Sequence, residues 1–93
     1  MEKTILAQIA NIKNITVSLM TYHKERMTLN ERALVEKLYY LMDDIVCDRI
    51  HHKHYTTEEY VDSMLMENAI VLKRTKNSEI KKLVNLLERG LKW

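Results

Sequence analysis

The sequence predicts an all-α protein, a compact bundle of about four helices, and two observations carry this prediction. The chain has one glycine and no proline in 93 residues, so it lacks the residues that tight β-hairpin turns require. Apolar residues also recur at intervals of three and four, the spacing of one face of an α-helix. At this length we expect a single domain, residues 1–93, whose small core a partner or a second copy would help to stabilise.

Two long helices are predicted first. A helix over about residues 3–25 follows from the apolar stripe Ile5, Ile9, Ile12, Thr16 and Leu19. Thr28 begins the second, because "TLNE" places Glu31 three residues after a threonine, the capping-box arrangement in which each side chain bonds the other residue's backbone N–H. The predicted inward stripe of this helix is Leu34, Leu38, Met42 and Ile45, flanked by Val35, Tyr39 and Val46.

Two shorter helices fill the rest of the chain. Thr56 and Glu59 in "TTEE" repeat the capping box and begin a helix whose predicted inward side chains are Tyr60, Val61, Met64, Leu65 and Leu72. Asn77 or Ser78 caps the last helix, and Gly90 ends it so that Leu91 and Trp93 fold back. Its stripe is Ile80, Leu83, Val84, Leu87 and Leu91. No glycine or proline separates these two helices, so "LKRTKNSE" could instead continue as one long helix.

The stretch "DDIVCDRIHHKH", residues 43–54, gathers aspartates, the only cysteine and three of the four histidines. Helical spacing puts Cys47 and His51 on one face, turned away from the core. A tetrahedral zinc site needs two further ligands, and Asp48 and His54 are poorly placed to supply them. Histidines near a helix C-terminus also interact favourably with the helix dipole, which explains them without a metal. We therefore predict no metal site, with Cys47 and His51 as weak candidates.

Positive charge is concentrated near the C-terminus. Residues 73–93 hold seven Lys and Arg against two Glu, a local net charge of +5, while residues 1–72 carry −3. Such a segment can meet nucleic-acid phosphates or an acidic protein surface, and it can equally be a solvated helix face that keeps a small protein soluble. The second predicted helix is too long for an ordinary helix-turn-helix unit. The basic patch consists of Lys73, Arg74, Lys76, Lys81, Lys82 and Arg89.

The first predicted helix carries more apolar surface than one buried stripe needs, because Leu6 and Val17 widen its apolar arc to about 200°. Its other face is small and uncharged, where a free surface helix usually has Lys and Glu. Either the other three helices or another protein could cover this face. Met66 and Ile70 form a second apolar spot, away from the main stripe of the third helix. The predicted partner-binding residues are Ala7, Asn11, Asn14, Ser18, Met66 and Ile70.

Several classes of function find no support in the sequence. It contains no glycine-rich phosphate loop and no recognisable catalytic triad, and the acids beside Cys47 disfavour the thiolate that a cysteine nucleophile needs. We therefore predict neither enzymatic activity nor a cofactor. Polar residues interrupt the apolar run of residues 4–21 too often for a membrane span or an export signal. A single cysteine fits a reducing compartment, so the predicted location is the cytoplasm.

These observations predict a small protein-binding module that acts through helix faces, as a monomer or as a homodimer. An inhibitor, an immunity protein, an adaptor, or a phage or mobile-element antagonist such as an anti-defence protein would fit. A mobile element is suggested by the abundance of Lys, Asn and Ile without Phe or Pro, which is typical of AT-rich genomes. The alternative is a nucleic-acid-binding regulator that uses the basic segment 73–92.

Overall fold

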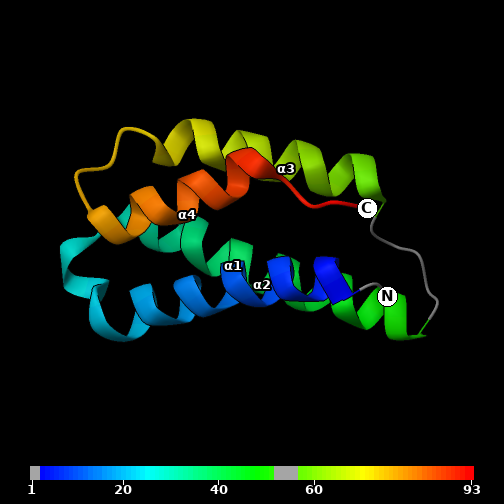
Figure 1. Ribbon diagram of the computed structural model, residues 1–93. Helices are drawn as coiled ribbons and strands as arrows, with labels where there is room; N and C mark the ends of the chain where they lie inside the picture. The colour runs from blue at the N-terminus through cyan, green and yellow to red at the C-terminus, as the bar shows by residue number, and fades with distance from the viewer. Residues whose placement is uncertain (1–2, 52–56) are drawn as a thin grey trace.

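Within residues 3–51 and 57–93, four antiparallel helices form a bundle, which confirms the predicted fold class (Figure 1). The computed structural model describes the backbone of residues 3–51 and 57–93, and the side chains of these residues apart from 49–51. The helices are α1 (Lys3–Tyr22), α2 (Leu29–His51), α3 (Glu58–Leu72) and α4 (Ser78–Arg89). A short 3-10 turn, η1 (Lys24–Arg26), follows α1, so the first helix ends a few residues earlier than expected.

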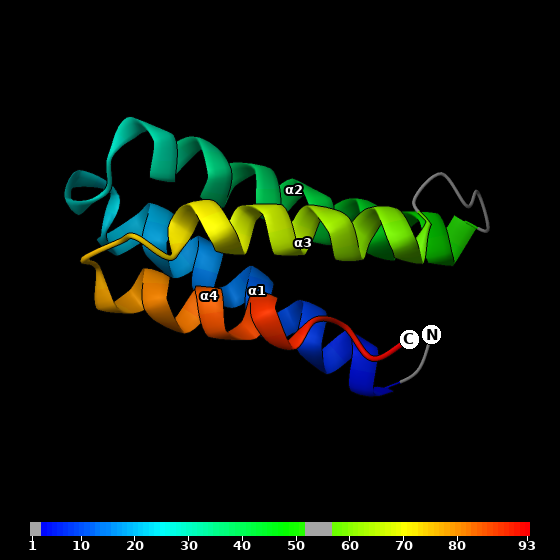
Figure 2. The same cartoon turned by 90° about the horizontal axis from the view of Figure 1, so that it is seen from above.

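The helices run alternately up and down, and α1 joins the two halves of the bundle. Packing is closest within the pairs α1–α2 and α3–α4, and α1 also packs along α4. The fourth seam, between α2 and α3, has the sparsest packing of the four. Figures 1 and 2 together show α2 and α3 apart along the bundle, because Figure 1 separates them near the end of α2 and Figure 2 separates them near its start.

One hydrophobic core receives side chains from all four helices. The predicted stripes of α1 and α4 are buried as expected. On α2 the buried stripe is turned slightly, because Val35 and Leu41 point inward while Leu34 is only half-buried. On α3 the prediction for Tyr60 is wrong, since this residue is 52% exposed. Asn68 is buried instead, and its Nδ2 donates to the backbone carbonyl oxygen of Met64 at 2.6 Å.

The helix caps follow the sequence with one correction. The capping box at α2 is confirmed, with Thr28 N donating to Glu31 Oε1 at 2.9 Å and Glu31 N donating to Thr28 Oγ1 at 3.1 Å. The cap of α3 is Thr57, whose Oγ1 accepts from Tyr60 N at 3.1 Å. The prediction of Thr56 is wrong by one residue, and Thr56 itself lies outside the described residues. With Thr57 as the cap, the reciprocal position falls on Tyr60, which cannot complete a capping box.

A turn separates α3 from α4, so the alternative of one long helix is wrong. The helix stops at Leu72 and resumes at Ser78, and both Leu72 and Ile80 are buried on either side of the turn. Asn77 caps α4, because its Oδ1 accepts from Glu79 N at 2.9 Å and from Ile80 N at 3.4 Å. The turn lets α4 pack back along α3, and it buries two apolar stripes that a continuous helix would expose.

The last residues fold back over the bundle, as Gly90 predicts. Gly90 has φ 68°, a left-handed conformation that favours glycine, and Leu91 beyond it is buried. Gln8 of α1 fixes this tail, because its Nε2 donates to the carbonyl oxygen of Gly90 at 3.3 Å and its Oε1 accepts from Lys92 N at 2.8 Å. Trp93 Nε1 donates to Asp62 Oδ1 at 3.1 Å. The tail therefore ties α4 to both α1 and α3.

Replacing Asn77 with alanine tests the cap that separates α3 from α4. Asn77→Ala removes the acceptor for two backbone N–H groups, so we expect the free energy of unfolding to fall by about 1 kcal/mol. Ser78→Ala, one residue later and exposed, is the matched control and should change stability by less than about 0.5 kcal/mol. Urea unfolding followed by circular dichroism measures both. An equal loss in the two variants would contradict the assigned cap.

Candidate interaction surface

The predicted binding face of α1 is open to solvent. Ala7, Asn11 and Asn14 are exposed and Ser18 is half-buried, because α1 packs on α2 and α4 through its opposite side. The alternative that the other three helices cover this face is therefore wrong. Within the part of the chain that the structure describes, these uncharged residues face outward, away from the other helices.

Apolar side chains add to this face of α1. Leu6 is 41% exposed and Val17 is 45% exposed, with Ala10 between them also exposed. These residues form the part of the wide apolar arc that the core does not use. We call the exposed residues Leu6, Ala7, Ala10, Asn11, Asn14 and Val17 the α1 face. Ala10 is absent from the predicted binding residues, although its spacing from Leu6 and Val17 was the signal that could have found it.

The only charge between Lys3 and the end of α1 does not point into the α1 face. Lys13 is turned toward α2, where its Nζ lies 2.7 Å from Asp43 Oδ1 and 5.1 Å from the centre of the Tyr39 ring. The hydrogen bond to Asp43 raises the pKa of Lys13. Lys13 therefore stays charged, and its charge is matched by Asp43 at the border with α2. The six residues of the α1 face carry no ionisable side chain, and the exposed Lys3, one turn before Leu6 and Ala7, places a charge at its N-terminal end.

The predicted spot on α3 is also exposed and is larger than expected. Met66 and Ile70 both face solvent, and Ile70 is 67% exposed. The structure adds Val71, which is 53% exposed. Sequence spacing did not single out Val71, because it is adjacent to the buried Leu72 and offers no periodic signal of its own.

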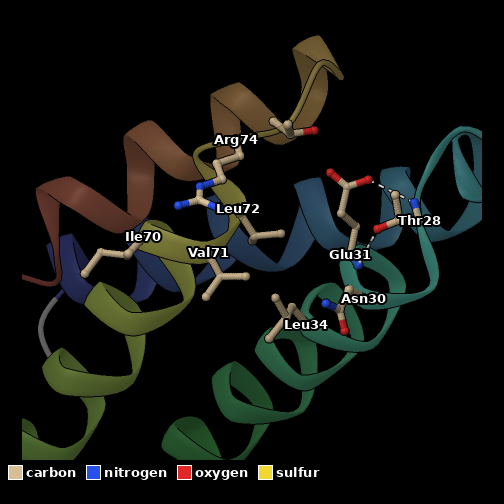
Figure 3. A pocket seen from close by; sticks show the side chains of 9 residues that line it. Thr28, Asn30, Glu31, Leu34, Ile70, Val71, Leu72 and Arg74 are labelled. Atoms are coloured by element: carbon tan, nitrogen blue, oxygen red, sulfur yellow. Dashed lines mark hydrogen bonds between the residues drawn. The ribbon is translucent and has the colours of Figure 1, made fainter.

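A hollow of about 540 Å³ lies between the first turns of α2 and the end of α3 (Figure 3). Leu34 stands on its α2 side and Val71 on its α3 side, and Arg74 lies at the end of α3. The capping box of Thr28 and Glu31 forms one border of the hollow. Its walls are mixed, with apolar side chains in the middle and polar groups around them.

The basic patch is exposed but is spread over the length of α4. Arg74 and Lys76 lie in the turn before α4, whereas Arg89 is the last residue of that helix. Two of the six cations have acidic neighbours. Lys82 Nζ lies 2.9 Å from Glu79 Oε1, and Lys73 Nζ lies 3.6 Å from Glu88 Oε1. The six residues therefore form a band of partly matched charge and are not gathered into one cluster.

The cysteine of the histidine-rich stretch is exposed, as predicted. Cys47 is a free thiol on the solvent side of α2, and Asp44 is exposed near it. The side chain of His51 lies outside the described residues, as does His54. Among the side chains that the structure describes, no group of three or more His, Cys, Asp or Glu could hold a metal ion. Within the same residues, no helix is both long enough and apolar enough to cross a membrane.

We predict that Cys47 and His51 can be replaced without loss of stability. The double variant Cys47→Ala/His51→Ala should unfold within about 0.5 kcal/mol of the unmodified protein, because an exposed thiol contributes little packing. Thermal unfolding measures this change, and elemental analysis of the purified protein measures bound zinc. Stoichiometric zinc that disappears in the double variant, together with a large fall in melting temperature, would contradict the prediction.

Comparisons of this chain with protein families, with curated protein sequences and with solved structures find no match.

Proposed function

We propose that this protein is a non-enzymatic binding module that attaches to another protein through the α1 face. The observation that carries the proposal is an exposed helix face without charge, made of small and apolar residues. Solvated helix faces usually carry Lys and Glu, whereas the centres of protein interfaces are depleted in charge. A face of this composition is better suited to contact with protein than to contact with water.

The α1 face has the chemistry to receive a helix or a flat apolar surface. Ala7 and Ala10 are small, so a partner backbone can approach α1 closely. Leu6 and Val17 supply the apolar area, and Asn11 can both donate and accept hydrogen bonds. The expected partner surface is therefore apolar at its centre, with backbone or amide groups placed opposite the asparagine.

A module of this size and chemistry fits a protein that acts by occupying the surface of another. An inhibitor, an immunity protein, an adaptor, or a phage or mobile-element antagonist such as an anti-defence protein works in this way. A cytoplasmic location accompanies the proposal, since the lone Cys47 is an exposed free thiol, which suits a reducing compartment.

The second candidate function is nucleic-acid binding, favoured by the exposed basic residues of segment 73–92. Its weakness is geometric, because the cations are spread along α4 and two of them face Glu79 and Glu88. Charge arranged in this way makes few simultaneous phosphate contacts and offers no base readout. An acidic rim on a protein partner would meet the same band of charge.

Asn11→Lys tests the α1 face directly. The new charge would be buried at the centre of the interface, so we expect the amount of partner captured from a native-host lysate to fall about tenfold or more. Asn85→Lys is the matched control, because Asn85 is exposed on α4, and it should leave capture unchanged. Mass spectrometry identifies the captured protein, and circular dichroism confirms that both variants fold. Full capture by Asn11→Lys would remove the proposal.

Salt dependence and charge reversal distinguish nucleic-acid binding from protein binding. We expect at most weak, sequence-independent retention of duplex DNA at physiological salt. If nucleic acid were the true partner, affinity would fall steeply with salt, and each lost phosphate contact would remove about 0.9 from the logarithmic salt slope. Reversing Lys73, Arg74, Lys81 and Lys82 should instead slow association with an acidic protein partner, which stopped-flow kinetics measures. Specific sub-micromolar binding to one DNA or RNA sequence would make the second function correct.

A further inference from the structure

At the seam between α2 and α3, protruding apolar side chains and a hollow lie side by side. Ile70 and Val71 project from α3 and are more than half exposed, and the hollow beside them contains the half-buried Leu34 of α2. Figure 3 shows Leu34 and Val71 on opposite sides of this space. The apolar side chains of α3 thus stand next to a space of the size that such side chains could fill.

The same seam carries two opposite charges, one on each helix. Lys37 of α2 and Glu67 of α3 border one hollow, together with Leu34 and Met64. The two charges therefore lie at the same level along the bundle. Within residues 3–48 and 57–93, neither Lys37 nor Glu67 has an ion-pair partner within 4 Å. Each charge is available to a group outside the chain.

A surface with this arrangement is complementary to itself. A two-fold axis parallel to the helices, placed over the seam, sets α3 of one copy above α2 of the other without changing the level along the bundle. Lys37 of each copy then lies opposite Glu67 of the other, and Ile70 and Val71 of each copy lie over the hollow beside Leu34 of the other. Two-fold interfaces are built from such reciprocal contacts.

We propose that this protein forms a two-fold symmetric homodimer through the α2–α3 seam. A second copy fits better than a different partner, because the seam of another copy supplies both a complementary shape and the opposite charge for each of the two unpaired residues. The bundle is 38 Å long, so an interface of standard size, about 800 Å² per partner, would extend along most of the seam. The dimer is independent of the proposed function, which uses the α1 face.

Sedimentation velocity of charge-reversed variants tests the reciprocal pairing. In a dimer of the Lys37→Glu variant, the new glutamate of each copy lies opposite Glu67 of the other copy. In a dimer of the Glu67→Lys variant, the new lysine lies opposite Lys37. Because like charges repel, each variant should self-associate about tenfold more weakly than the unmodified protein at low salt. A mixture of the two single variants pairs Glu with Lys at both contacts, so the dimer should return. The double variant Lys37→Glu/Glu67→Lys should also dimerise by itself.

Glu36→Lys and Lys81→Glu are the matched controls, because both residues are exposed away from the seam, and both variants should dimerise normally. Ile70→Lys should remove the dimer by placing a charge at the apolar contact. The inference is overturned if the unmodified protein sediments as a monomer at about 100 µM. It is also overturned if mixing the two single variants restores nothing. A monomer that still captures a partner through the α1 face would overturn the dimer and leave the proposed function intact.

Discussion

The burial of one stripe of α1 between α2 and α4 is the contact on which the arrangement of this bundle depends. The α1–α2 and α3–α4 pairs are joined mainly along the α1–α4 seam, and Gln8 strengthens this junction by holding the C-terminal tail. Fully burying an apolar side chain contributes about 1.5–3 kcal/mol, so the stripe that includes Ile12 and Leu19 outweighs any single surface contact in the protein. Because the halves are joined on this side, the opposite seam between α2 and α3 is left open.

The same constraint explains why α1 has an exposed face without charge. Two neighbouring helices can cover only part of the circumference of a third, and the apolar arc of α1 is wider than that part. Leu6 and Val17 fall outside the covered part and are exposed beside Asn11 and Asn14. Both candidate surfaces thus follow from the position of α1. A dimer through the α2–α3 seam would leave the α1 face of each copy free for a different protein.

The sequence predicts the fold well because its signals are local. Capping residues such as Thr28 and Asn77 act on N–H groups two or three positions away, and helical spacing identifies the buried residues of α1 and α4. Prediction from the sequence fails where tertiary packing decides which side chains are buried. Helical spacing assigns Tyr60 to the inward side of α3, but in the folded bundle this residue is 52% exposed. Spacing likewise groups Asn11 with Asn14, whereas only the positions of the other helices show that nothing within the bundle covers them.

Binding through the α1 face requires that this face is uncovered in the isolated protein and covered in the complex. Methyl NMR with a soluble paramagnetic agent measures this most directly, using Leu6 and Val17 as reporters and the buried Leu19 as reference. We expect strong relaxation enhancement at Leu6 and Val17 in the isolated protein, and a loss of that enhancement when the captured partner is added. Leu6 and Val17 that are as protected as Leu19 in the isolated protein, or that stay equally accessible in the complex, would contradict binding through the α1 face.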